Sequence, residues 1–208
     1  MKSYLDIDKW ERKEHYLFYK GFDEPFFGIT AEVDCTVAYL KAKTSGKSFY
    51  LYYLHQLLRA INSIEALKYR MEDDKVAQYE SVNISPTIPR PNGTFGFGFF
   101  KYYTEFEEFY QAAEEVINRV KSENTLVPGG RQDVVHFSAI PWLKFTSISH
   151  ARHFAMQDSI PKLSTGKVYE SQGRQYMPVS VHANHALVDG YHIGLLIESF
   201  QVFLNEEE

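Results

Sequence analysis

A histidine beside a tight turn, about 20 residues before the end of the chain, constrains this fold more than any other feature. Residues 177–181 have the composition of a strand, and residues 193–203 carry apolar side chains at helical spacing. The dipeptide Asp189-Gly190 between them is typical of a turn. His185 is therefore expected at a strand-to-helix junction, where a rigid scaffold can hold its imidazole against a substrate. An imidazole exchanges a proton near neutral pH, so His185 is a candidate general base.

The rest of the chain alternates between predicted helices and short predicted strands. Helices are expected at 8–19, with Asp6 or Asp8 as N-cap, at 48–64, and at 104–120 before a loop at 128–130. Strands are expected at 26–33, 67–71, 76–79, 93–102, 134–139 and 145–149, with a hairpin of 168–172 and 174–181 around Gly173. Helices interspersed unevenly with hairpin-like strands predict a single α+β domain over residues 1–208, with two layers and a mixed β-sheet flanked by helices.

Composition argues against several classes of protein. The net charge of −5 and the absence of a basic cluster argue against a nucleic-acid partner. No apolar run approaches the ~20 residues that a membrane span needs, and the charged N-terminus lacks the apolar region of a signal peptide. Cys35 is the one cysteine, which excludes an internal disulfide framework. We expect a cytoplasmic protein with no membrane partner.

The residue types around His185 leave more than one chemistry open. A zinc site built from His182, His185, Asp189 and His192 lacks the HExxH or paired CxxC spacing, and His182 and His185 would point to opposite faces of a strand. No metal is therefore expected. A serine nucleophile would need G-x-S-x-G, which is absent. His185 with Asp189 could be a base and its supporting acid, or simply a hydrogen-bonded histidine.

A family resemblance decides between these readings. Residues 184–190 (Asn-His-Ala-Leu-Val-Asp-Gly) resemble the His-His-x-x-x-Asp-Gly motif of chloramphenicol acetyltransferases, which the catalytic domains of dihydrolipoyl acyltransferases share. The likeness covers nearly the whole chain. It continues through residues 4–16, 138–142, 145–147, Gly166-Lys167 and Met177-Pro178. The resemblance implies the coenzyme A-dependent acyltransferase fold and a homotrimer with active sites at the subunit interfaces.

The resemblance also implies catalytic roles. His185 would be the general base that takes the proton of an acceptor hydroxyl, so that the oxygen attacks the thioester of acetyl-CoA directly. Ser138 would hydrogen-bond the tetrahedral oxyanion. Asp189 would form a salt bridge with Arg12 that supports the loop rather than relaying charge. Asn184 stands where the family has the first, non-catalytic histidine of its doublet.

Further positions correspond to the family's binding sites. Ser164 stands where a threonine is common and would support a bound water, and Lys167 and Lys47 would lie near coenzyme A. Phe18, Tyr19 and Phe95 keep the aromatic character of the acceptor pocket. Five other pocket positions, mostly apolar or aromatic in the drug-binding enzymes, are Val127, Ile148, His150, Arg152 and Lys162. Three of the five are polar or charged, which brings chloramphenicol as acceptor into question.

The function predicted from the resemblance is acetyl-CoA-dependent O-acetylation of a small hydroxylated molecule, with chloramphenicol the leading acceptor and antibiotic resistance the consequence. No tightly bound cofactor is expected, because acetyl-CoA is a co-substrate. Two alternatives stay open. The chain could transfer another acyl group or use another hydroxylated acceptor, or it could be a non-catalytic ligand-binding relative.

Overall fold

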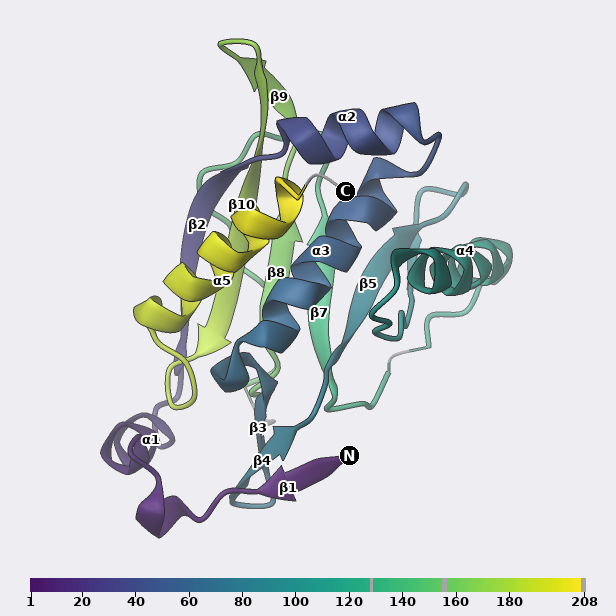
Figure 1. Cartoon of the computed structure of the whole chain (residues 1–208). Coiled ribbons are helices and arrows are strands. Elements are labelled where there is room, and N and C mark those ends of the chain that lie inside the picture. The colour runs from purple at the N-terminus through teal and green to yellow at the C-terminus, as the bar shows by residue number, and fades with distance from the viewer. Residues whose placement is uncertain (128, 155–156, 207–208) are drawn as a thin grey trace.

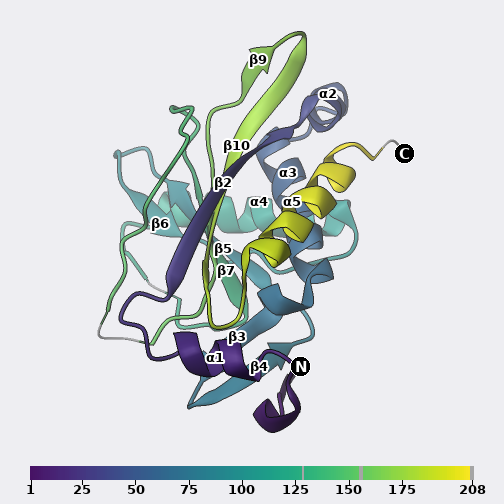
Figure 2. The same cartoon turned by 90° about the vertical axis from the view of Figure 1, so that its left-hand side faces the viewer.

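A mixed β-sheet forms the centre of the molecule, and helices cover one of its faces (Figures 1 and 2). The computed structural model describes residues 1–127, 129–154 and 157–206. The order of the hydrogen-bonded strands is β2-β10-β8-β7-β5-β6, and β9 pairs with the start of β10. The pairs β5–β7 and β7–β8 are parallel and the others are antiparallel. The bounds are β2 Phe26–Asp34, β5 Asn83–Pro89, β6 Phe95–Phe97, β7 Val134–Ala139, β8 Lys162–Thr165, β9 Tyr169–Ser171 and β10 Arg174–Asn184.

The helices lie in one layer against this sheet, as the side view shows (Figure 2). They are α2 Thr36–Thr44, α3 Phe49–Ser63 and α5 Gly190–Leu204, with α4 Phe106–Ser122 beside the β5 edge. Ser48 caps α3, because its hydroxyl accepts the backbone N–H of Leu51. A separate small sheet has the order β1-β4-β3 and lies near α1. Its strands and the remaining short helices are β1 Lys2–Tyr4, β3 Tyr69–Glu72, β4 Lys75–Tyr79, α1 Lys13–Tyr19, η1 Ile7–Lys9 and η2 Glu65–Lys68.

The hydrophobic core fills the space between the helices and the sheet. Side chains alternate between the two faces of a strand, and the apolar ones point toward the helices. On β10 this set includes Val179, Val181 and Ala183, all buried, which belong to the same hydrophobic cluster as Leu196 and Phe200 of α5. Polar side chains therefore occupy the opposite face of the same strands.

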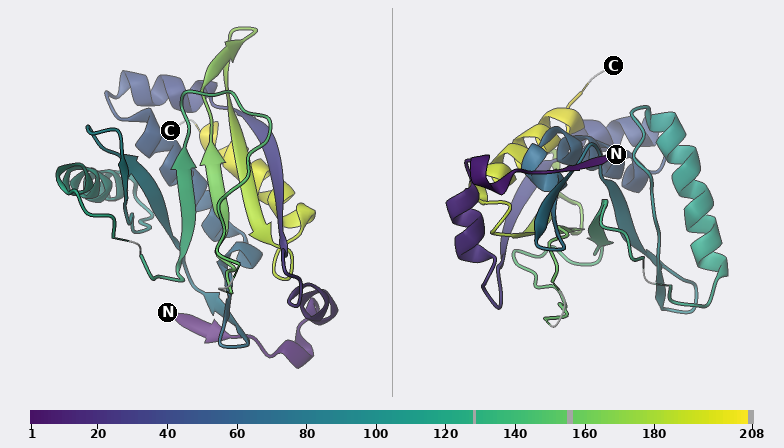
Figure 3. Two further views of the ribbon diagram at one scale, coloured as in Figure 1. Left: turned by 180° about the vertical axis from the view of Figure 1, so that it is seen from behind. Right: turned by 90° about the horizontal axis from the view of Figure 1, so that it is seen from below.

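We call this opposite side of the sheet the outer face. Residues 140–154 and 157–161, here named the crossing loop, pass in front of it while α3 and α5 lie behind (Figure 3, left). The loop is tied to the sheet by backbone hydrogen bonds, among them Ile140 N–H to Thr165 O at 2.8 Å and His136 N–H to Pro161 O at 2.9 Å. Part of the outer face is thus covered by loop rather than by helix.

The predicted fold class, an α+β two-layer domain with a mixed sheet, is confirmed. The hairpin around Gly173 and the strands at 26–33 and 134–139 are also present. Two predicted elements are wrong. The helix expected at 8–19 begins at Lys13, because Trp10 has an extended backbone after η1, which Asp6 caps. The strand expected at 145–149 is irregular and belongs to the crossing loop.

Other differences concern elements that the sequence analysis did not anticipate, namely α2, β1, β5 and β8. The strand expected at 93–102 is confined to Phe95–Phe97. Pro128, in the loop expected at 128–130, lies outside the described residues. Within the described ranges, no helix has the length and apolar character required to cross a bilayer.

Candidate active site

His185 follows β10 directly and packs against aromatic rings. Its imidazole stacks on Tyr19 of α1, with ring centroids 4.2 Å apart and planes 2° from parallel. Phe27 of β2 also packs on it, with a centroid distance of 4.5 Å and planes 37° apart. Two rings therefore fix the orientation of the imidazole, as a general base requires. The His185 Nδ1 atom is buried and has no hydrogen-bond partner among the described residues.

Asn184 organises the turn that carries His185. Its side-chain oxygen accepts the N–H of Ala186 at 3.0 Å, and its amide donates to the carbonyl of Asp158 at 3.1 Å. Its backbone carbonyl accepts the N–H groups of Leu187 and Val188, both at 3.0 Å. The asparagine in place of the family's first histidine thus has its polar atoms paired and fixes the local backbone.

Arg12, which directly precedes α1, holds this loop in place through its guanidinium group. One guanidinium nitrogen lies 2.6 Å from an Asp189 carboxylate oxygen, so the expected ion pair is formed. The other nitrogens donate to the carbonyls of His185, at 2.9 Å, and Ala186, at 3.3 Å. The side chains are 13% and 32% exposed, so water screens this pair only in part. Arg12 binds the backbone of the catalytic candidate itself.

Asp189 also begins helix α5. Its second oxygen accepts the N–H of Tyr191 at 3.1 Å, and its own N–H donates to His192 Nδ1 at 3.2 Å. This arrangement is a capping box. Burial alone would raise the pKa of Asp189, but the hydrogen bond from Arg12 and the nearby charges outweigh it and lower the pKa. Asp189 is therefore ionised at neutral pH, and it contacts Arg12 rather than the His185 ring.

Ser138 lies on the outer face in a row of hydroxyl side chains. The register pairs Ser138 with Ser164 across β7 and β8, and Ser164 with Ser180 across β8 and β10. The Thr87 hydroxyl lies 3.4 Å from the Ser138 oxygen. Ser164 is fully buried, and its hydroxyl has no partner within the described part of the chain. Such an atom fits the expectation that Ser164 supports a bound water.

His185 and Ser138 are not adjacent within one chain. Phe27, which contacts His185, pairs with Ala183 and so lies on the helix-covered face, whereas Ser138 lies on the outer face. Ser138 is in register with Ser180, which lies two strands away from it across the sheet. Ser180 in turn precedes His185 by five residues in the chain. These spacings separate the two Cα atoms by roughly 20 Å. One substrate cannot contact both side chains of the same chain.

The aromatic residues expected in the acceptor pocket are also divided. Phe18 and Tyr19 form a cluster with Phe22 on and just after α1, next to His185. Phe95 is on β6, at the opposite edge of the sheet, where it packs on Phe97. Phe18 is 64% and Phe95 is 47% exposed. Both groups of rings are open to contact with a further molecule.

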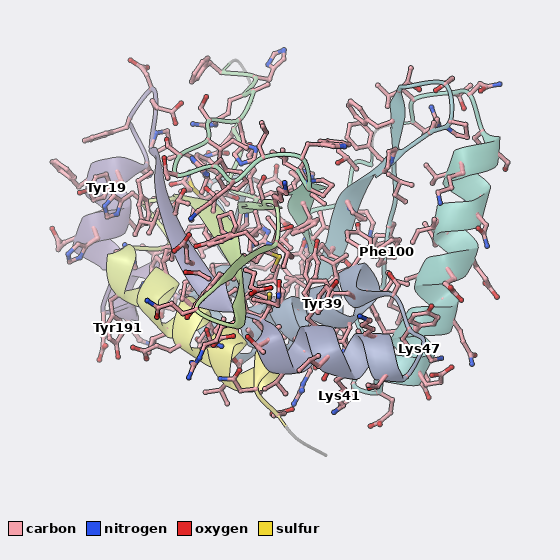
Figure 4. The ribbon with its side chains drawn as sticks, turned by 90° about the horizontal axis from the view of Figure 1, so that it is seen from above. Tyr19, Tyr39, Lys41, Lys47, Phe100 and Tyr191 are labelled. Carbon is pink, nitrogen blue, oxygen red and sulfur yellow. The ribbon has the colours of Figure 1, made fainter. Side chains whose placement is uncertain are left out.

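The two lysines expected near coenzyme A differ in their surroundings. Lys47 forms an ion pair with Glu107 of α4 at 2.9 Å, and Figure 4 shows it at the opposite end of the molecule from Tyr19. Lys167 is exposed, and its backbone N–H donates to Leu143 at 2.8 Å. Lys167 has no ion pair with any described residue, so its exposed ammonium is available to an anionic ligand.

The polar positions of the expected pocket gather on and over the outer face. Lys162 is on β8, and His150, Arg152 and Ile148 come from the crossing loop. His136 and His182 lie on the same face, because each pairs with Lys162 in the register. The sequence analysis did not assign these two histidines to the pocket. His136 and Ser138 are two residues apart in one predicted strand, so their side chains share a face, and this spacing was the available signal.

Unsatisfied polar atoms mark both this region and the separate surroundings of His185. Four of the five buried side-chain atoms without a partner in the described ranges belong to predicted site residues: His150 Nε2, Arg152 Nε, Ser164 Oγ and His185 Nδ1. Such atoms are rare in folded proteins and call for a ligand or water. A cavity of about 410 Å³ includes His136, Phe97 and the exposed Val127. A larger one, about 660 Å³, lies on the Arg12 side of the loop and does not include His185. Among the described residues no three His, Cys, Asp or Glu side chains could together hold a metal ion.

Known proteins resemble this chain over nearly its whole length. The sequence model of the family described as "Chloramphenicol acetyltransferase" matches residues 2–201. Chloramphenicol acetyltransferase 3 of Escherichia coli is 27% identical over 208 residues, which cover 98% of this chain and 97% of that protein. A solved chloramphenicol acetyltransferase superposes with a TM-score of 0.93 at 34% identity, covering 99% of this chain and all of the other. A probable dihydrolipoamide acetyltransferase from Listeria monocytogenes shares the fold, with a TM-score of 0.62 at 13% identity over 94% of this chain and 92% of that one.

Proposed function

This chain belongs to the chloramphenicol acetyltransferase family and is an acyltransferase, and from that membership we propose that it transfers the acetyl group of acetyl-CoA to a hydroxyl of a small molecule. The observation that carries the proposal is the His185 imidazole, which packs against Tyr19 and Phe27 and lies on a loop clamped by Arg12. A polar side chain on a rigidly supported turn is what a positioned general base needs.

The mechanism requires one proton acceptor and one oxyanion donor. A free imidazole nitrogen of His185 takes the proton of the acceptor hydroxyl while that oxygen attacks the thioester carbonyl carbon. The π electrons of the carbonyl move to its oxygen, which becomes negatively charged and accepts a hydrogen bond from the Ser138 hydroxyl. When the carbonyl reforms, the carbon–sulfur bond breaks, and the departing thiolate of coenzyme A takes the proton back from His185. No covalent acyl-enzyme is needed.

We assign each active site to two copies of the chain. His185 and Ser138 of a single chain lie on opposite faces of the sheet, and the pocket aromatics lie at its two edges. A cyclic homotrimer in which the His185 edge of one copy meets the outer face of its neighbour brings the two residues together. The exposed Phe18 and Phe95 are then covered by the contact.

Release of free thiol from acetyl-CoA tests the proposal. The assay uses a panel of hydroxylated acceptors that includes chloramphenicol, and repeats it with other acyl-CoA donors. Turnover with at least one acceptor, lost in His185→Ala, is the expected result. Turnover with another donor alone would favour a different acyltransferase. Coenzyme A binding without turnover of any acceptor would instead favour a non-catalytic relative.

A further inference from the structure

A row of polar and basic side chains crosses the outer face next to the hydroxyl row. The register aligns one residue from each of five neighbouring strands, β5, β7, β8, β10 and β2: Ser85, His136, Lys162, His182 and Gly28. The His182 ring lies over Gly28, where an added Cβ would be only 2.2 Å from Nε2. Glycine is therefore required there for the imidazole to lie flat on the sheet. We name these five residues the basic row.

The crossing loop adds two more basic side chains to the basic row. His150 packs edge-on against His182, with ring centroids 4.8 Å apart. The guanidinium carbon of Arg152 lies 3.8 Å from the centroid of the Phe26 ring, and the Lys162 ammonium lies 4.6 Å from the same ring. Two cations thus share one aromatic ring, although like charges repel. Both side chains are only 10% exposed.

Two cations in or beside the basic row are each paired with one carboxylate. Arg152 pairs with Glu24, and Lys162 pairs with Asp158, both at hydrogen-bonding distance. A third cation, Arg70, is fully buried and donates to backbone carbonyls. Burial lowers the pKa values of His136 and Lys162, the charge of Arg70 adds to this effect, and the carboxylates of Asp133 and Glu72 act on Arg70 in turn. Glu24 is 47% exposed at the rim, so its charge is the more strongly screened.

The histidines of this region are uncharged at neutral pH. Burial, together with His182, Lys162 and His136, lowers the pKa of His150 to about 4. Burial and the charge of Lys162 also lower the pKa values of His136 and His182. An anion placed among these rings would oppose both effects and draw protons onto them. The site can therefore gain further positive charge when an anion enters.

Two buried donors in this region, Arg152 Nε and the Ser164 hydroxyl, lack acceptors among the described residues, and His150 Nε2, which donates or accepts according to its tautomer, also lacks a partner there. A buried guanidinium N–H without an acceptor is costly, and a charged acceptor is its strongest partner. The basic row lies two residues along the strands from the hydroxyl row, which is about 7 Å. An anion held at His182 would lie roughly 12 Å from Ser138, because the two residues are two strands and two positions apart.

We infer that the acceptor is a hydroxylated molecule that also carries an anionic group, a carboxylate or a phosphate, roughly 12 Å from the reacting hydroxyl, with Arg152 and His150 holding the anion. The inference rests on the proposed function, whose site it completes. It separates this chain from its named relatives, since chloramphenicol is uncharged. Arg152 and His150 are then specificity-determining residues.

Matched probes test the inference in turnover. The acid 4′-(hydroxymethyl)biphenyl-4-carboxylate has its hydroxyl and carboxylate at about this separation, its methyl ester removes the charge, and 4′-(hydroxymethyl)biphenyl-4-yl phosphate exchanges the anion. We expect the acid or the phosphate to exceed the ester in kcat/KM by about tenfold or more, because charge-assisted hydrogen bonds are lost with the ester. Whichever anion is preferred identifies the group. An ester equal to or better than both anions would overturn the inference.

A binding experiment keeps the inference separate from the proposed function. Ligand-observed NMR measures the dissociation constant of benzoate, with benzyl alcohol as the uncharged control. Arg152→Gln should weaken benzoate binding about tenfold, whereas Glu24→Gln, which removes a rim carboxylate, should strengthen it several-fold. If Arg152 only stabilised the fold, Glu24→Gln would not strengthen benzoate binding. Arg174→Gln is the matched control, because Arg174 also has one carboxylate partner, Asp34, but lies far from the row.

The outcomes of the two experiments are distinct. Benzoate binding that depends on Arg152, without thiol release from any acceptor, would support the anion site and refute the proposed function. Turnover of neutral acceptors with no benzoate binding would refute the anion site and leave the proposed function standing. Equal benzoate affinity in the parent, Arg152→Gln and Glu24→Gln would also overturn the inference.

Discussion

Breaking the Arg12–Asp189 pair should destabilise the fold and the active-site loop together. Asp189→Ala removes an N-cap, worth about 1 kcal/mol, and a charge-assisted hydrogen bond, worth about 1.5–3 kcal/mol. Because the two side chains are 13% and 32% exposed, the lower part of that range applies, and the total is about 3 kcal/mol. Asp189→Asn keeps a capping oxygen, so its cost should be about half as large.

Urea unfolding at fixed protomer concentration measures these differences. A thermal melt should show Asp189→Ala about 6–12 °C below the parent, given about 2–4 °C per kcal/mol for a domain of this size. The double change Arg12→Ala with Asp189→Ala should cost about 1–2 kcal/mol less than the sum of the single changes. The exposed pair Lys13–Asp8, at 2.8 Å, is the control, with coupling below about 0.5 kcal/mol. Additive effects at Arg12 and Asp189 would refute the clamp.

Three further predictions concern catalysis, specificity and pH. Ser138→Ala should lower kcat by about 10²–10³ with an unchanged KM for acetyl-CoA, whereas a change in KM alone would indicate a binding role. His150→Leu combined with Arg152→Val should raise kcat/KM for chloramphenicol about tenfold for each ~1.4 kcal/mol recovered, and a decrease would refute the polar-pocket assignment. His136, His150 and His182 have lowered pKa values in the folded chain. Between the ordinary pKa of 6.5 and the folded pKa, which is about 4 for His150, these histidines are therefore protonated in the unfolded chain but not in the folded one. Stability should therefore fall as the pH falls through this window, and urea midpoints that stay constant from pH 7 to 4.5 would contradict it.

Local sequence signals predicted the parts of the fold that local interactions determine. Asp189-Gly190 after an apolar strand predicted the turn that presents His185, and the structure forms that turn through Asn184 and the Asp189 cap. Ser48 likewise marked the start of α3. These signals depend on residues within a few positions of one another, so one sequence suffices to read them.

The elements that were missed depend on partners distant in the chain. Pro86 and Pro89 argue against a central strand, yet β5 pairs in parallel with β7 up to Pro86. β8 is only four residues long and gains its stability from β7 and β10 on its two sides. Residues 145–149 alternate like a strand but have no strand beside them. Alternation alone does not supply a pairing partner.

The same limit explains what could be predicted of the site. The family resemblance placed Arg12 and Asp189 in one ion pair, which the structure contains. It did not place His136 and His182 beside Lys162, because that contact arises from the register of three strands. Register cannot be read from the residues of one strand. The roles of His185 and Ser138 stay predictions until they are measured.

The central claim is that each active site combines His185 of one copy with Ser138 of another. Two variants, His185→Ala and Ser138→Ala, are each expected to be nearly inactive. The two variants are unfolded, mixed in equal amounts and refolded together. After random assembly, about a quarter of the intersubunit sites contain both a native His185 and a native Ser138. The account predicts about a quarter of the parent's thiol-release activity from the mixture. A mixture no more active than the average of the two variants refolded separately would contradict it.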